Sequence, residues 1–223
     1  MIAYASRTGT RRNLDALRSA GWRLMISARG VLRTEGFRYA LDNGAWTSFQ
    51  RGEAFHDAAF ERAVAMLGPG ADWIVLPDIV MGGAASLAFS RRWLDRLRYR
   101  PSLSRAAFLL AVQNGMKPAQ IRHMLGPRLG IFVGGDTQWK LATMAQWARL
   151  AHASGAICHV GRVNSARRIR LCAAAGIDSF DGSGVSRFCA ALPPLDRARR
   201  QADIEGWLST SRKTNPCCVG SAS

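Results

Sequence analysis

Long apolar runs, a secretory leader and an ordered cysteine pattern are all lacking from this sequence of 223 residues. No run approaches the roughly 20 apolar residues that span a bilayer, and the first residues lack the basic-then-apolar order of a signal peptide. The five cysteines are Cys158, Cys172, Cys189, Cys217 and Cys218. Because their number is odd and their spacing fits neither zinc ligands nor a disulfide framework, we expect free thiols in a cytoplasmic protein without structural zinc. A zinc site that uses Cys158 and His159 is the alternative.

Lysine is scarce as well, and acids are few. Only Lys117, Lys140 and Lys213 are lysines among the 31 basic residues, which outnumber 15 acids and leave a net charge of +16. This excess predicts a polyanionic partner. Because the arginines are spread over many predicted helices rather than gathered in one tail, the charge favours a broad phosphate-binding surface. A genome rich in arginine codons is the other explanation of the composition, and charge alone does not exclude it.

Short apolar runs are present instead, and they alternate with amphipathic segments. The runs span residues 2–6, 23–27, 38–43, 73–78, 108–113, 130–135, 157–162 and 178–183. Each is too short for a buried helix and is bounded by Gly, Asn or Pro. Helices are predicted at residues 13–22, 58–68, 85–98, 118–125, 138–155, 165–176 and 195–208. This alternation predicts the α/β class with a parallel sheet.

The number of strands predicts the architecture of that sheet. Eight strands alternating with helices predict a compact (β/α)8 barrel, the TIM barrel, as a single domain over residues 1–208. Residues 209–223 are predicted to form a disordered tail. A doubly wound open sheet is the competing architecture, but the glycine-rich phosphate loop of that class is absent after the first strand.

Polar residues stand at the ends of most of these runs. They are Asp42, Asp78, Gln113, the pair Gly134–Gly135, Arg162 and Asp181. The carboxyl ends of the strands form the site in a barrel, so these residues are expected around one mouth. No serine or cysteine has an obvious histidine partner, which argues against acyl transfer, whereas paired carboxylates suit glycosyl chemistry. A divalent metal held by the three aspartates is the alternative.

The same segments resemble the tRNA-guanine transglycosylase superfamily. Residues 41–46, LDNGAW, are similar to its Asp-Ser-Gly-Gly segment, and residues 109–115, LLAVQNG, are similar to its Val-Gln-Gly strand. Residues 131–135, IFVGG, resemble its Gly-Gly strand, and residues 158–187 resemble the run that leads to Phe-Asp-Cys and Thr-Arg. The order and spacing agree across residues 37–188. The chain most resembles the short DpdA-like proteins of phages and bacteria, which are similar to 7-deazaguanine transglycosylases that modify DNA.

This resemblance implies a function and three catalytic or binding roles. The implied enzyme is a glycosyltransferase that exchanges guanine for a 7-deazaguanine base in nucleic acid, with DNA favoured over tRNA and no cofactor. Asp181 matches the nucleophile that bonds to C1′ of the nucleoside. Asp42 matches the acid/base aspartate, and Asp78 matches the aspartate that holds the purine. A glycosylase that releases the base to water and a non-catalytic nucleic-acid-binding barrel are the alternative functions.

The remaining contacts to the substrate follow from the same resemblance. Gln113 and a backbone N–H of Gly134 or Gly135 would complete the purine pocket, because guanine O6 needs donors. The chain lacks the zinc-binding subdomain and the insertions of the tRNA enzymes, so its own basic residues would have to contact the ribose-phosphate. The candidates are Arg162, Arg187 and Lys140.

Overall fold

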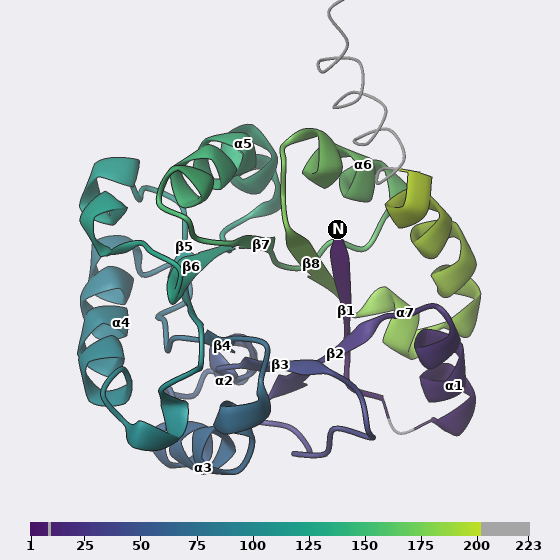
Figure 1. The fold of residues 1–223 in the computed structure, drawn as a ribbon, viewed down its shortest axis with the longest axis horizontal. Helices are drawn as coiled ribbons and strands as arrows, with labels where there is room; N and C mark the ends of the chain where they lie inside the picture. Colours follow the sequence, from purple (N-terminus) through teal and green to yellow (C-terminus); the bar gives the residue numbers. More distant parts are fainter. Residues whose placement is uncertain (9, 202–223) are drawn as a thin grey trace, which may run out of the picture.

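Parallel strands close into a barrel, as the alternation in the sequence predicts. The computed structural model describes residues 1–8 and 10–201. The strands follow one another around the ring in chain order: β1 (Ile2–Ser6), β2 (Arg23–Ser27), β3 (Tyr39–Asp42), β4 (Ile74–Val75), β5 (Phe108–Val112), β6 (Leu129–Val133), β7 (Cys158–Val160) and β8 (Ser179–Gly182). Pairing of β1 with β8 closes the ring, and helices surround it (Figure 1). The predicted (β/α)8 barrel is confirmed.

Helices return the chain from the end of most strands to the start of the next. The α-helices are α1 (Arg11–Ser19), α2 (Ala45–Gln50), α3 (Asp57–Leu67), α4 (Gly83–Leu97), α5 (Thr137–Ala153), α6 (Ala166–Ala174) and α7 (Gly184–Arg187). Single 3₁₀ turns are η1 (Gly68–Gly70), η2 (Pro101–Leu103), η3 (Pro118–Gln120), η4 (Arg122–Met124) and η5 (Cys189–Ala191). Within the described residues, no helix has the length and apolar character to cross a membrane.

The helices differ from the prediction in four places. The helix predicted at 118–125 is replaced by η3 and η4. The segment still packs Ile121, Met124 and Leu125 on the core, and eight residues are too few for helix propensity alone to impose an α-helix there. The short helices α2 and α7 were not predicted, because a helix of one or two turns carries no clear periodicity. The predicted helix at 195–208 is seen over 192–201, and the rest of it, with the predicted tail, lies outside the described residues.

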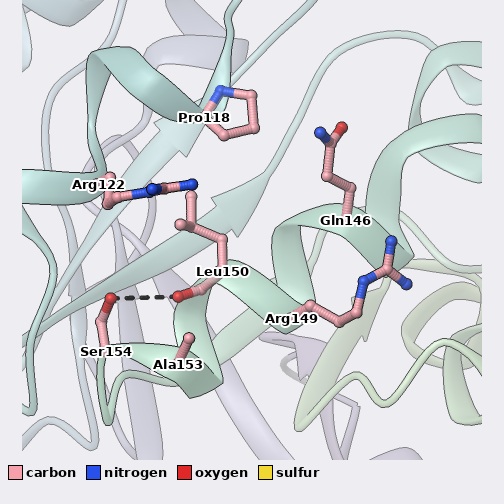
Figure 2. Close-up of a pocket in the computed structure, with 7 residues that line it drawn as sticks. All are labelled: Pro118, Arg122, Gln146, Arg149, Leu150, Ala153 and Ser154. Carbon is pink, nitrogen blue, oxygen red and sulfur yellow. Dashed lines mark hydrogen bonds between the residues drawn. The ribbon is translucent and has the colours of Figure 1, made fainter.

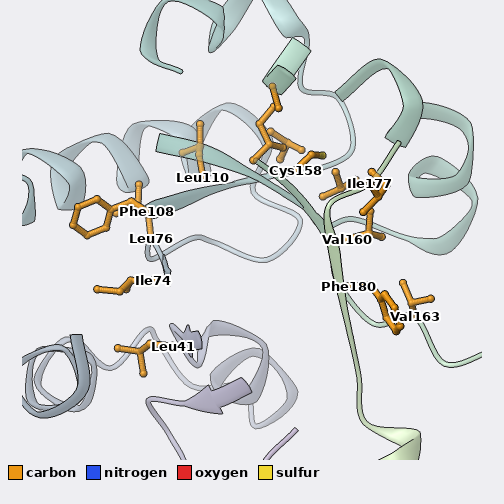
Figure 3. Close-up of a cluster of buried hydrophobic side chains, with 14 of the residues drawn as sticks. Leu41, Ile74, Leu76, Phe108, Leu110, Cys158, Val160, Val163, Ile177 and Phe180 are labelled. Carbon is orange, nitrogen blue, oxygen red and sulfur yellow. The ribbon is translucent and has the colours of Figure 1, made fainter. Parts of the chain in front are cut away.

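The hydrophobic core has two parts, because successive side chains of a strand point to opposite faces. One part lies between the strands and the helices and includes Leu41, Leu76, Leu110 and Phe180 (Figure 3). The other part fills the inside of the barrel. It consists of Tyr4, Met25, Ala40, Trp73, Val75 and Leu109. Burying one large apolar side chain contributes about 1.5–3 kcal/mol, so the interior acts as a packed plug rather than a channel.

A polar cluster seals the amino-terminal end of the barrel. The carboxylate of Asp72, which precedes β4, accepts hydrogen bonds from the Tyr4 hydroxyl at 3.0 Å, from Arg23 at 2.9 Å and from Arg38 at 2.7 Å. Burial, and then the charge of Asp72, raise the pKa of Tyr4 well above its usual range, so the phenol stays a donor. The barrel is therefore closed at this end, and the carboxyl ends of the strands form the opposite mouth.

Candidate active site

The mouth at the carboxyl ends of the strands brings three carboxylates together. Asp42 is the last residue of β3, Asp78 follows β4, and Asp181 lies in β8. The pKa of Asp42 is raised to about 6, first by burial and then by the negative charge of Asp181, with a smaller contribution from Asp78. Asp78 and Asp181 are thus both close enough to influence Asp42, in agreement with the shared position of the three at strand ends.

Asp42 is oriented by the glycine that follows it. The Gly44 N–H donates a hydrogen bond to Oδ2 of Asp42 at 3.1 Å. Gly44 has a φ of 80°, and a Cβ at this position would lie 2.5 Å from Cγ of Arg29. Any other residue would be strained by the left-handed backbone and would displace Arg29. Glycine is therefore needed to fold the backbone around Asp42.

Asn43, between these two residues, connects Asp42 to the second carboxylate. Its side chain is buried, and Nδ2 donates to the Leu76 carbonyl at 2.7 Å and to Oδ1 of Asp78 at 2.8 Å, while Oδ1 accepts from the Ala45 N–H at 2.8 Å. The sequence predicts only a turn residue here, because Asn is common in turns. A role for its side chain could be suspected only from its place directly after a strand-end acid.

Asp78 is held between two amides. Gln113 donates from Nε2 to Oδ2 of Asp78 at 2.7 Å, and Asn43 occupies the other oxygen. Burial raises the pKa of Asp78 to about 6, although these two hydrogen bonds oppose the shift. The backbone N–H of Asp78 is a third donor to this carboxylate, which has about four acceptor positions in all, so Asp78 is still able to accept from a ligand.

Gln113 lies at the mouth, but its side-chain N–H groups are already used in hydrogen bonds within the protein. Its Nε2 also lies 3.0 Å from the Ile79 carbonyl and 3.1 Å from Oγ of Ser86, and its Oε1 accepts from the Gly82 N–H at 3.2 Å. The predicted donation from this amide to the purine is therefore not supported. Gln113 positions Asp78 instead.

The two glycines after β6 differ in what they offer. The Gly134 N–H donates to the Val112 carbonyl at 2.9 Å, so it is used in the sheet and is not the predicted donor to the purine. The Gly135 N–H has no acceptor among the described residues. Gly135 has a φ of 74°, and a Cβ there would lie 2.5 Å from Oδ1 of Asn114. Of the two predicted backbone donors, Gly135 is the one available to a ligand.

Asp181 has one oxygen held and one oxygen open. Oδ1 accepts from the backbone N–H of Arg162 at 3.2 Å and lies 3.1 Å from Nε2 of His159. No donor within the described part of the chain contacts Oδ2, and the side chain is 11% exposed. His159 lies beneath it among the rings of Tyr4, Trp73 and Phe132. The sequence favours a core role for this histidine, so its contact with Asp181 was missed.

Arg162 closes one side of the mouth. Its guanidinium carbon lies 4.1 Å from the centre of the Trp46 ring, and its Nη2 donates to the Gly135 carbonyl at 2.9 Å. Trp46 itself packs against Phe49, and both rings are partly exposed. This aromatic and cationic surface beside the carboxylates was not predicted. Arg187, at the end of α7, is exposed and has no carboxylate partner among the described residues.

Lys140 is not placed as predicted. Its side chain is buried, and Nζ donates to the carbonyl of Gly161 at 2.6 Å. Burial, and then the charge of Arg162, lower its pKa to about 8. A buried ammonium that is bound to a backbone carbonyl does not face solvent, so the predicted phosphate contact of Lys140 is not supported.

The alternative metal sites find no support in the geometry. No group of three or more His, Cys, Asp or Glu side chains within residues 1–8 and 10–201 is placed to hold a metal ion. Cys158 and His159 are neighbours on β7 and point to opposite faces of the sheet. Burial also raises the pKa of Cys158 well above its usual range, which disfavours the thiolate that zinc requires.

A separate hollow lies on the outside of the barrel, away from the mouth. It is formed by η3, η4 and α5 and is lined by Pro118, Arg122, Gln146, Arg149, Leu150, Ala153 and Ser154 (Figure 2). It contains two arginines but no carboxylate, and its walls hold no catalytic group. The mouth is therefore the better candidate for chemistry.

Comparison with known proteins does not assign the chain to a family. No protein-family model matches the chain, and no curated protein matches it. The function must therefore be inferred from the residues of the mouth.

Proposed function

We propose that the protein is a transglycosylase that exchanges guanine for a 7-deazaguanine base in nucleic acid, with DNA as the favoured substrate. The observation that carries the proposal is the state of the carboxylates at the mouth. Asp181 has one oxygen fixed by donors and one open, and the pKa values of Asp42 and Asp78 are both raised to about 6. A fixed carboxylate beside an acid/base group is the arrangement that double displacement at a sugar carbon requires.

The proposed reaction has two displacements at C1′. Oδ2 of Asp181 attacks C1′, the bond from C1′ to the guanine nitrogen breaks, and the electron pair leaves with guanine, which takes a proton from Asp42. The incoming base then loses its proton to Asp42 and attacks C1′, and the ester bond to Asp181 breaks. A pKa of about 6 suits Asp42 to both steps, because it exchanges protons near neutral pH.

Recognition of the purine is proposed to depend on Asp78. Guanine presents two adjacent donors, N1–H and the exocyclic amine, and an ionised carboxylate is the acceptor that suits such a pair. The free Gly135 N–H is suited to donate to O6. A target within a duplex would have to be flipped out of the base stack to reach this depth.

Asp78→Ala is expected to weaken the binding of guanine about 10- to 100-fold, because the two donors of the base lose their acceptors. Titration calorimetry with free guanine measures this loss. Asp57→Ala removes a carboxylate from the exposed start of α3 and provides the matched control, for which no change is expected. Equal guanine affinity in Asp78→Ala and the wild type would remove Asp78 from this role.

Binding of nucleic acid is expected to weaken steeply as salt rises, because arginine–phosphate contacts release counterions. Arg187→Ala should reduce the slope of log affinity against log salt by about 1. The matched control is Arg96→Ala on α4, since Arg96 pairs with Glu61 on the outer surface. Fluorescence anisotropy with a labelled oligonucleotide at several salt concentrations gives the slopes. An affinity that does not change with salt would argue against a phosphate-binding surface.

The function itself is tested by the nucleosides it produces. Mass spectrometry of DNA and tRNA from an expressing host should reveal a 7-deazaguanine nucleoside in DNA. An exchange reaction leaves no abasic site, whereas a hydrolytic glycosylase would leave one, and a barrel that only binds nucleic acid would leave both polymers unchanged.

A further inference from the structure

We infer that Lys140 and His159 are positioning residues that together fix Oδ1 of Asp181 and leave Oδ2 as its reacting oxygen. Only the statement that Oδ2 is the reacting oxygen rests on the proposed function. The fixing of one oxygen is a property of the folded protein, and it can be measured without substrate.

Lys140 acts on Asp181 through a peptide group. The carbonyl of Gly161 and the N–H of Arg162 belong to the same planar peptide unit and point in opposite directions. Lys140 binds the carbonyl end at 2.6 Å, and Asp181 accepts from the N–H end at 3.2 Å. A cation on the oxygen polarises the peptide and strengthens its N–H as a donor. It also holds this turn, in which Arg162 has a φ of 60°.

His159 supplies the second donor to the same oxygen. Its Nδ1 lies 2.8 Å from Oγ of Ser179, and its Nε2 lies 3.1 Å from Oδ1 of Asp181. A carboxylate only accepts, so the proton is on Nε2, and the Ser179 hydroxyl donates to Nδ1. Burial lowers the pKa of His159, which keeps the ring neutral and this tautomer in place.

The chain of serine, histidine and aspartate is not a hydrolase triad. Ser179 is 2% exposed and His159 is fully buried, whereas Asp181 is the member nearest the mouth. A nucleophile must reach its substrate, so Ser179 is excluded from that role by its position inside the barrel. The hydrogen bonds run from the serine through the histidine to the aspartate. They therefore orient the aspartate and do not activate the serine as a nucleophile.

Lys140 and His159 act on the same oxygen of Asp181 from different elements, α5 and β7. The charged or titratable groups that interact with Lys140 are Asp136, His159, Arg162, Arg168, Cys172 and Asp181. Two of these are carboxylates, Asp136 and Asp181. Asp136 is the N-cap of α5 and accepts from the Trp139 N–H, whereas Asp181 is joined to the ammonium through the Gly161–Arg162 peptide.

The test is the ¹³C NMR signal of the carboxyl carbon of Asp181 without substrate at one fixed pH, assigned from its loss in Asp181→Asn. His159→Phe keeps a ring in the barrel but removes the donor, and Lys140→Met keeps the length of the side chain but removes the ammonium. Each change should move the chemical shift of this carbon away from the wild-type value, because the carbon senses the hydrogen bonds that its oxygens accept. His159→Gln, which restores an N–H near the position of Nε2, should return the signal toward its wild-type position.

Matched controls are available for both changes. His152→Phe removes an exposed histidine that pairs with Asp178, and Lys117→Met removes an exposed lysine. Neither should move the signal of Asp181. Thermal unfolding of each variant shows whether it is folded, and if Lys140→Met does not fold, His159→Phe with its glutamine rescue decides the question. An unchanged carboxyl signal in folded His159→Phe would overturn the inference.

A second measurement separates this inference from the proposed function. The rate of covalent adduct formation with an oligonucleotide should fall about tenfold in His159→Phe, with the affinity for guanine unchanged, and should recover in His159→Gln. A wild type that forms no adduct would reject the transglycosylase proposal, yet the NMR signal of Asp181 would still decide whether His159 and Lys140 fix its carboxylate. An altered signal with an unaltered adduct rate would reject the assignment of Oδ2 as the reacting oxygen.

Discussion

Asp181→Asn is expected, under the proposed function, to abolish the covalent adduct between protein and oligonucleotide and to lower base exchange by at least about 10³-fold, because loss of the proposed nucleophile removes the covalent route altogether. Guanine should still bind, since Asp78 and its supporting amides are untouched. The side-chain amide matches the carboxylate in shape, so its carbonyl oxygen can take the place of Oδ1 and accept the same hydrogen bonds. A denaturing gel of protein mixed with labelled oligonucleotide detects the adduct directly.

The control for this experiment is Asp178→Asn. Asp178 immediately precedes β8, at the end of that strand away from the mouth, and accepts from the Cys158 N–H at 2.7 Å. Its substitution should leave the adduct intact. An adduct that persists in Asp181→Asn would transfer the nucleophilic role to Asp42, which is the other carboxylate at the mouth that has no amide side chain holding it.

Asp42→Asn is expected to make the protein more stable at neutral pH and much less active. Burial and the charge of Asp181 raise the pKa of Asp42 from 3.8 to about 6. The folded state therefore binds this proton more tightly than the unfolded state. The stability that results is fully present below about pH 4 and is lost as the pH rises through about 6.

A neutral amide avoids this loss. At pH 8 the free energy of unfolding of the variant should exceed that of the wild type by about 1–2 kcal/mol. This is less than the pKa shift of Asp42 would give in full, because the side chain is partly exposed. The difference should shrink toward zero near pH 4. Exchange should fall by about 10²- to 10⁴-fold, the usual contribution of an acid/base group.

Urea denaturation at pH 4 and pH 8 measures the stability of both proteins. Asp15→Asn is the matched control, because Asp15 lies on the surface of α1 beside Arg18 and its loss should give no gain at either pH. A stability difference that is the same at both pH values would show that ionisation of Asp42 is not its cause. An Asp42→Asn variant with wild-type exchange would remove Asp42 from proton transfer.

The strands and the carboxylates could be predicted because each has a local signal. An apolar run of five residues such as 108–112 identifies β5, and an acid at the tip of a run, such as Asp42, is visible without knowing its neighbours. In a closed parallel barrel, the carboxyl ends of all the strands lie around one mouth, so acids at these ends come close together. The prediction for Asp42, Asp78 and Asp181 needed only this rule.

The hydrogen-bond partners of these carboxylates could not be predicted in the same way. Asn43 contacts Asp78 across 35 positions of sequence, and His159 contacts Asp181 across 22. Nothing near His159 in the sequence distinguishes it from a core residue. The commitment of Gln113 and Gly134 to internal bonds likewise depends on distances that only the folded chain defines.

The polar seal at the amino-terminal end of the barrel has a consequence for the order of events. Asp72 joins Tyr4, Arg23 and Arg38 there, and the space above them is filled by Trp73 and Leu109. A base that is released at the mouth has no second exit. Under the proposed exchange, the departing guanine must leave through the mouth of the barrel before the incoming base can enter by the same route. Free guanine should then compete with the new base for the covalent intermediate and drive the reaction backward, which makes removal of guanine the step that gives the exchange its direction.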